Sequence, residues 1–254
     1  KPEVDKSGNG HAIIRFLPAP NNEDVPFVRV FDHGFQGPGG WFIEKSLTTL
    51  GQNDPVSEYN TTLWNSGVES SKDQARKQKR RLSFVSNIYV VKDPTNPHNE
   101  GKVFLYKFGK KIFDKLNDQM NPEFEDEKAV NPFDLWEGTS FRLKMRNVEG
   151  FRNYDKSEFD SPAPLLDDDA KLEEVWKGQY SLQEQIDPSQ FKSYDELKSR
   201  LYRVLALDGG PQTSTATVDE QYAPTPAATA PHVSAVDTAD DDDESLSFFK
   251  KLAD

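Results

Sequence analysis

Residues 82–94 and 101–109 constrain the fold of this chain more than any other part of the sequence. Both segments are rich in β-branched and aromatic residues, and the run Asp-Pro-Thr-Asn-Pro that separates them ends strands. This pattern predicts two strands that pair across a short loop. Residues 8–17, 26–35, 41–46 and 138–151 have the length and alternation of further strands. The run Gly-Pro-Gly-Gly at 37–40 predicts the turn of a hairpin between two of them.

Helical patterns occur in the middle and in the last third of the chain. Apolar residues at 112, 113, 116 and 120 predict a helix over 110–120, and residues 165–207 have a helical texture. Ser193 and Glu196 form a capping-box pattern ahead of the last helix. Residues 47–65 suit an irregular loop, and 70–81 suit a helical turn or a mobile basic loop. We therefore expect a mainly β fold with a helical appendage, either a small Greek-key barrel or a sandwich.

Composition narrows the class of protein. The chain has 254 residues, of which 35% are hydrophobic, and no cysteine, so it carries neither a disulfide framework nor a thiolate metal site. No apolar run has the length of a membrane span, and no signal peptide is visible. These features predict an intracellular protein that does not act at a membrane.

A basic stretch contrasts with the rest of the chain. The formal net charge is −12, yet residues 72–115 contain twelve Lys and Arg against four Asp and Glu. Aromatic residues are interleaved with these cations. Cations neutralise phosphates and flat rings stack on bases, so the combination points to single-stranded nucleic acid.

Three clusters of cations beside aromatic strands make up the candidate binding surface. A run of charge is usually a solvated face, but its recurrence in three segments of an acidic chain favours binding. In 138–151 apolar residues alternate with cations, which predicts a half-buried strand with a cationic outer face. A strand Phe is more often core than a stacking surface, so Tyr106 is the favoured ring of its strand. The clusters are Lys79, Arg80 and Arg81; Lys107, Lys110 and Lys111; and Arg142, Lys144 and Arg146.

No catalytic motif accompanies this surface. The four histidines lack metal-ligand spacing, and the phosphate-binding, serine-hydrolase and zinc-protease motifs do not occur. The sequence therefore predicts a binding protein without enzymatic activity. Two alternatives stay open: an RNA-binding translational regulator that uses the same groove, and a metal-dependent nuclease, for which no carboxylate cluster can be singled out.

Several segments resemble one known family. They read NGHAIIRFLP from residue 9, HGF at 33–35 followed by WFIE at 41–44, SNIYVVKDPTNPHNEGKVFLYKFGKKIFDK at 86–115, and WEGTSFRLK at 136–144 with GFRNYDKSEF at 150–159. They are similar to the single-stranded DNA-binding, or helix-destabilising, protein of T-even-type bacteriophages. The resemblance is close over residues 8–160 and looser up to 207. It implies an OB-fold core, a five-stranded Greek-key barrel that binds single-stranded DNA, and work in replication, recombination and repair in the infected host's cytoplasm.

The resemblance also implies particular groove residues. Carried over position by position, the family's basic cluster and the aromatics of its groove and lobe have counterparts here. At Phe84 the family more often has Tyr, and Val85 stands where Trp is expected. The counterparts are Lys79, Arg80, Arg81, Phe84, Tyr106, Phe151, Tyr154, Tyr59 and Trp64.

A zinc site of the family has lost its thiolates in this chain. The family can carry a His-Cys-Cys-Cys site, and His33 keeps the histidine. Ser46, Asp54 and Ser57 stand at the three Cys positions. Serine and a lone carboxylate do not replace thiolates on Zn²⁺, so we predict that no zinc or other cofactor is bound.

The domain organisation follows from the same comparison and from composition. We expect an OB-fold core over 1–164 with a small inserted lobe at about 33–70, a helical appendage over 165–211, and a flexible linker with an acidic tail over 212–254. The tail is expected to recruit replication and recombination proteins. The family's basic N-terminal arm has no counterpart here, which predicts weakened self-association along DNA.

Overall fold

The computed structural model of the chain describes residues 3–124 and 126–207. These residues divide into two units: the first holds residues 3–32 and 81–191, and the second holds residues 33–80 and 192–207. The predicted linker and acidic tail over 212–254 lie outside the described residues. Within the described ranges, no helix has both the length and the apolar character needed to cross a membrane.

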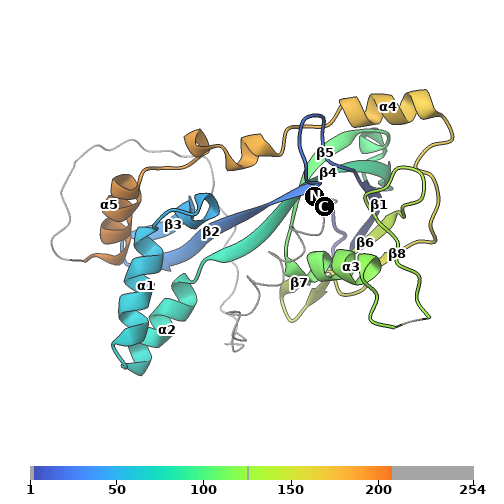
Figure 1. Cartoon of the computed structure of the whole chain (residues 1–254). Coiled ribbons are helices and arrows are strands. Elements are labelled where there is room, and N and C mark those ends of the chain that lie inside the picture. Colours follow the sequence, from blue (N-terminus) through green and yellow to red (C-terminus); the bar gives the residue numbers. More distant parts are fainter. Residues whose placement is uncertain (1–2, 125, 208–254) are drawn as a thin grey trace. The chain divides into compact units, whose positions relative to one another are not determined.

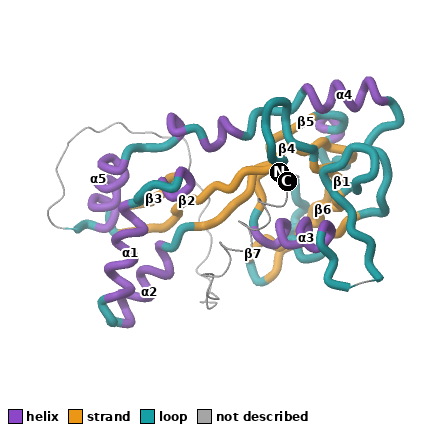
Figure 2. Tube along the Cα trace, in the orientation of Figure 1, coloured by secondary structure: helices purple, strands orange, loops and turns teal. Residues whose placement is uncertain are grey.

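The first unit is built on a curled antiparallel sheet that forms a half barrel (Figures 1 and 2). Strand β4 (Arg81–Lys92) pairs with β1 (Gly10–Phe16), with the first half of β2 (Phe27–Gly37) and with β5 (Val103–Phe108). On the other side of β1 lies β6 (Phe141–Val148), which pairs in turn with the short strands β7 (Phe151–Asn153) and β8 (Glu158–Phe159). The predicted pairing of the two central segments is confirmed.

Strand register gathers aromatic rings on the inner face of this sheet. Phe84 lies opposite Phe108 on β4 and β5, and Ile14 of β1 lies opposite Phe141 of β6. Since alternate residues of a strand point to the same face, these pairs place a row of rings in one core. Phe16 is fully buried there, with its ring centroid 5.5 Å from that of Phe108. Aromatic burial therefore supplies much of this core.

Two helices cover the sheet of the first unit. Helix α3 (Lys110–Met120) buries Ile112, Phe113 and Leu116, as its spacing predicts, and the Phe113 ring stacks on Phe84 at 4.1 Å. Helix α4 (Asp169–Lys177) buries Leu172 in a separate cluster with Leu17. Short 3-10 turns occur at Pro97–Asn99, Gln183–Ile186 and Pro188–Gln190.

The second unit joins a hairpin to three helices. The last part of β2 continues into this unit and pairs with β3 (Gly40–Lys45), which confirms the predicted hairpin. Helices α1 (Pro55–Asn65), α2 (Glu69–Gln78) and α5 (Tyr194–Leu205) complete the unit. The predicted capping box of Ser193 and Glu196 opens α5. Gly39 lets the hairpin approach the end of α5, since its N–H donates to the Val204 carbonyl at 2.8 Å and a Cβ would overlap the Arg203 carbonyl.

The irregular loop predicted over 47–65 is wrong. A 3-10 turn occupies Leu47–Leu50 and helix α1 occupies Pro55–Asn65. Asp54 is the N-cap of α1 and accepts from the backbone N–H groups of Val56 and Ser57, while Pro55 fits the first helical position. The same Asp-Pro pair that suggests a turn therefore starts a helix. Of the two forms expected for 70–81, the helix is present as α2.

Candidate nucleic-acid interface

Strand β6 presents cations on one face and core residues on the other. Phe141, Leu143 and Met145 are buried, whereas Arg142 and Arg146 are exposed and Lys144 is half-buried. The predicted half-buried strand is therefore confirmed. Its regular alternation places three cations in a row along one side of the sheet.

Each of these three cations has a carboxylate partner. Arg142 Nε lies 2.8 Å from Asp160, Lys144 Nζ 2.6 Å from Glu158, and Arg146 Nη2 2.5 Å from Asp155. The hydrogen bond from Arg146 lowers the pKa of Asp155, and that from Lys144 lowers the pKa of Glu158. Exposed ion pairs of this kind add little stability, so a phosphate can exchange with the carboxylate.

An exposed ring stands next to this row. Phe151 on β7 exposes 59% of its surface, and strand register sets it opposite Val148 of β6. Its strand neighbour Asn153 accepts from Lys111 Nζ at 3.2 Å, which ties the start of α3 to β7. Phe151 and Asn153 share a face of β7. Exposed aromatic surface and the cation of Lys111 thus lie on the same side of this hairpin.

Arg152 belongs to the same hairpin, although sequence reasoning missed it. It is exposed between Phe151 and Asn153, and its charge acts on Tyr106, which places both in one neighbourhood. The signal was present in the sequence, because Arg152 lies inside the segment that carries Phe151 and Tyr154. Tyr154 is half-buried and packs against the aromatic core.

Two predicted ring positions lie in the core. Phe84 is 1% exposed and Tyr106 is 9% exposed, both within the aromatic cluster of the first unit. Burial raises the pKa of the Tyr106 hydroxyl well above its usual range. In this conformation neither ring offers a free face to a base. Their role in binding stays a prediction.

The remaining predicted cations lie at two other places. Lys107 of β5 pairs with Asp32 at 2.5 Å, and Lys110 pairs with Asp114 one turn along α3 at 3.0 Å. Residues 79–81 join the end of α2 to the start of β4. They form the densest run of positive charge among the predicted site residues: Lys79, Arg80 and Arg81.

Tyr59 and Trp64, the two aromatic residues predicted to belong to the inserted lobe, lie on α1 in the second unit. Tyr59 is half-buried, and Trp64 exposes 49% of its surface. Arg76 and Lys72 of α2 lie over the Trp64 ring, at 5.4 and 5.9 Å from its centroid. Sequence reasoning did not connect these cations with Trp64, because the pairing depends on how α1 and α2 cross.

The four positions of the family's zinc ligands converge around one carboxylate. Asp54 Oδ1 accepts from His33 Nε2 at 3.2 Å and from the N–H of Ser57 at 3.0 Å, and its Oδ2 accepts from Ser46 Oγ at 2.9 Å. His33 Nδ1 faces the main-chain carbonyl of Gln78 at 3.1 Å. Both ring nitrogens of His33 therefore face oxygen acceptors.

These donors do not fit zinc. Tetrahedral Zn²⁺ takes thiolate, imidazole or carboxylate ligands, and this set offers one imidazole and one carboxylate that already bond to each other. The Asp54 carboxylate is further occupied by backbone N–H groups of Leu47 and Val56. No group of three or more His, Cys, Asp or Glu side chains able to hold a metal occurs in residues 3–124 and 126–207, and the whole chain has no cysteine.

A curled antiparallel sheet with a row of surface cations and an exposed ring beside it is the kind of surface that nucleic-acid-binding proteins present. The family described as "gp32 DNA binding protein like" matches residues 8–205. This chain therefore belongs to that family.

Curated relatives agree with this assignment. The "Single-stranded DNA-binding protein" of Enterobacteria phage T4 is 39% identical over 230 residues, which cover 88% of this chain and 76% of that protein. The protein of the same name from Enterobacteria phage T2 is 39% identical over 228 residues, covering 87% and 75%. A shorter match joins 61 residues, 23% of this chain and 54% of the relative, to the "Single-stranded DNA-binding protein" of Escherichia phage SV14 at 46% identity.

Proposed function

We propose that this chain binds single-stranded DNA with little sequence preference and without catalysis. The observation that carries the proposal is the exposed Phe151 ring on the β6–β7 hairpin, on the same face as the β6 cations and on the same side as Lys111 from α3. Cations follow the phosphate backbone while a ring stacks on a base, and neither contact depends on base identity. The names of the relatives from phages T2 and T4 support the same ligand.

The half barrel of the first unit serves, in this proposal, as an OB-fold core. The strand order is not sequential along the sheet, and α3 lies between β5 and β6 in the chain. Both features suit a Greek-key barrel of this type. The second unit then corresponds to the inserted lobe, held by packing and by the Asp54 hydrogen bonds in place of a metal.

The biological role follows from the ligand. A protein that binds exposed bases stabilises the open state of DNA by mass action and so lowers the melting temperature of a duplex. Coating and protecting single strands in this way suits phage DNA replication, recombination and repair in the host cytoplasm. Replication and recombination proteins are the partners that we assign to the acidic segment within residues 212–254.

A fluorescence titration of the full chain tests the proposed function. We expect oligo-dT to quench the aromatic fluorescence and to bind more tightly than matched duplex, with affinity that falls steeply as salt rises. Phe151→Ala should weaken oligo-dT binding about tenfold, because one base stack is lost. Phe124→Ala is the matched control, since Phe124 is also an exposed ring, 62% exposed, of the first unit.

Three outcomes would contradict parts of the proposal. Equal affinity for duplex and oligo-dT would mean that the surface reads only phosphates. Tighter binding of oligo-U than of oligo-dT would favour the RNA-binding alternative. An equal effect of both Phe substitutions would remove Phe151 from the interface.

Removing the carboxylates that pair with the β6 cations is expected to raise oligo-dT affinity, whereas Phe151→Ala is expected to lower it. Replacing Asp155 and Asp160 by Asn and Glu158 by Gln leaves Arg146, Arg142 and Lys144 without these partners. Oligo-dT affinity should then rise about tenfold at low salt, and the gain should shrink as salt screens it. Salt-dependent titrations measure this change. Glu173→Gln, which breaks the exposed pair with Lys177 on α4, is the control, and unchanged affinity in the triple variant would show that these cations do not contact DNA.

A further inference from the structure

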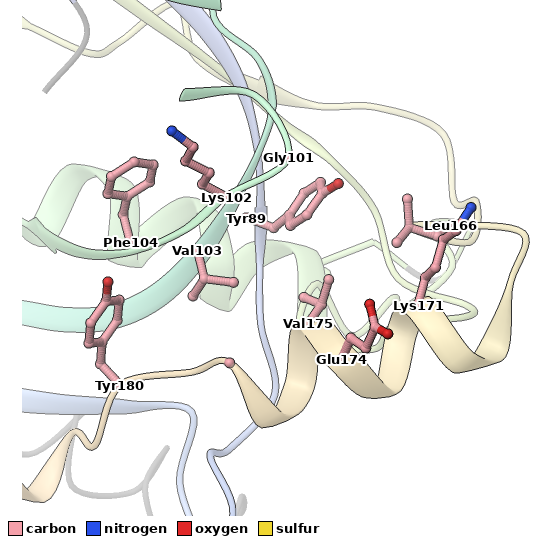
Figure 3. A pocket seen from close by; sticks show the side chains of 11 residues that line it. Tyr89, Gly101, Lys102, Val103, Phe104, Leu166, Lys171, Glu174, Val175 and Tyr180 are labelled. Atoms are coloured by element: carbon pink, nitrogen blue, oxygen red, sulfur yellow. The ribbon is translucent and has the colours of Figure 1, made fainter. Parts of the chain in front are cut away.

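A cavity of about 540 Å³ opens between the β4–β5 pair and helix α4 in the first unit (Figure 3). Its volume suits a small organic ligand. The lining comes from β4, β5, α4 and the segment that follows α4, and it contains none of the residues assigned above to DNA binding. The residues that matter for its chemistry are three aromatics, two lysines and one glutamate: Tyr89, Phe104, Tyr180, Lys102, Lys171 and Glu174.

Two of the rings stand on different walls of this cavity. Phe104 is half-buried on β5 and packs against the aromatic core, whereas Tyr180 comes from the segment after α4 with 51% of its surface exposed (Figure 3). The backbone of Tyr180 is held in place although its ring is not. Its N–H donates to Asn87 Oδ1 at 3.0 Å, and its carbonyl accepts from Asn87 Nδ2 at 2.8 Å.

Asn87 is fully buried on β4, so this double hydrogen bond fixes the Tyr180 main chain against the sheet. The fixed main chain therefore places the Tyr180 side chain at the cavity, although that side chain is not itself packed in place. Because the main chain of Tyr180 is already fixed, less backbone freedom is lost when its ring stacks on a ligand, which favours binding.

Part of the cavity lining packs against a hydrophobic cluster. Tyr89 and Val103 are half-buried and pack against the cluster that holds Leu17 and Leu172. Trp176 of the same cluster donates its indole N–H to the Ala19 carbonyl at 3.0 Å. A flat, apolar ligand group can therefore rest on a surface that does not need to rearrange.

The polar groups of the cavity are available for a ligand. Among the described residues, the Lys102 and Glu174 side chains make no ion pair or hydrogen bond, and Lys171 approaches only Asp168, at 3.9 Å. Two cations suit a phosphate, and a single carboxylate suits the N–H or O–H donors of a base or sugar. Aromatic walls, cations and one acceptor together match the parts of a nucleotide.

We propose that this cavity binds one nucleotide, with the base against Val103 and Tyr180 and the phosphate at Lys102. The proposal that this nucleotide belongs to a bound strand rests on the proposed function. Lys107, in the predicted interface, and Val103, in the cavity lining, lie on the same face of β5 four residues apart, a span of about 13 Å. A strand bound at Lys107 reaches the cavity within a few nucleotides.

The test uses the full chain, oligo-dT carrying 5-iododeoxyuridine, and thymidine monophosphate as a separate probe. Photocross-links to Tyr180 are expected. Lys102→Gln and Tyr180→Ala should each weaken the binding of long oligo-dT about tenfold. The matched controls Lys177→Gln and Phe124→Ala should leave it unchanged. Tyr180→Ala keeps the Asn87 contacts, because these use only the main chain.

The possible outcomes distinguish a nucleotide of a bound strand from a free nucleotide, and both of these from a cavity that binds neither. Cross-links at the cavity with weakened oligo-dT binding support a strand. NMR shifts of cavity residues with the monophosphate, together with unchanged oligo-dT affinity in both variants, support a free nucleotide. Cavity residues that respond to an acidic peptide but to neither nucleotide probe overturn the proposal, as does the absence of any cavity response. If the wild-type chain fails to bind oligo-dT, the proposed function fails, while the monophosphate titration still tests the cavity.

Discussion

Asp54→Asn is expected to destabilise the second unit by about 3–5 kcal/mol, since it removes the ionised partner of a buried pair. Asp54 and His33 are each 1% exposed. Burial by itself would raise the pKa of Asp54, but hydrogen bonds from His33, Ser57 and Ser46 outweigh it and hold that pKa well below its usual range. The carboxylate is therefore ionised in the folded state, and its charge is compensated by contacts from three segments of the unit.

An asparagine cannot reproduce these contacts. Both oxygens of Asp54 accept from N–H or O–H donors: Oδ2 from Ser46 and the Leu47 N–H, and Oδ1 from the Val56 N–H and others. In Asn an NH₂ group replaces one of the two oxygens. The NH₂ donor then faces N–H or O–H groups that are donors themselves. The buried donors left without partners add to the cost.

Hydrogen exchange measures this loss where it occurs. The amides of α1 and β3 should exchange faster in Asp54→Asn, whereas those of β1 and β6 in the first unit should change little. Asp73→Asn is the matched control, because Asp73 makes an exposed ion pair with Arg76 in the same unit. Equal protection of α1 in both variants would show that the Asp54 contacts do not hold the unit together. Wild-type chain that loses protection in α1 on treatment with a chelator would instead indicate a bound metal.

The same residue shows what the sequence could and could not predict. Asp54 and Pro55 read as a breaker, because polar residues around them hide any helical periodicity. The capping box of α5 could be predicted from the sequence, since it depends on two residues three positions apart. The hydrogen bonds of Asp54 join residues from 33 to 57 in the chain, and a local pattern does not carry that information.

Strands were predicted better than the faces they present. The alternation in 138–151 identifies its buried side, because Arg142, Lys144 and Arg146 lie together on the other side. Strand β5 has apolar residues on both sides, so its pattern leaves open which side is core. The structure buries Tyr106 and Phe108 and exposes Leu105. The cavity beside α4 was not foreseen, because its lining comes from segments that are distant in the sequence.

Replacing Lys79, Arg80 and Arg81 by Gln together is expected to lower oligo-dT affinity about 100-fold at low salt. Each cation that contacts a phosphate contributes to affinity through the release of a counterion. The slope of log affinity against log salt should therefore become shallower by about two, given roughly 0.7 for each phosphate on a single strand. At high salt the triple variant and the wild type should converge, because counterion release then contributes little.

A second triple variant separates local charge from total charge. Lys128, Lys177 and Lys198 are exposed and lie outside the predicted interface, and their replacement by Gln removes the same three charges from the chain. If the summed charge of −12 governed binding, both variants would lose affinity equally. A local field falls off within about 10 Å at 0.1 M salt, so the control should lose less than threefold. Equal losses would mean that residues 79–81 act only through net charge, and that their clustering in an acidic chain does not explain the binding.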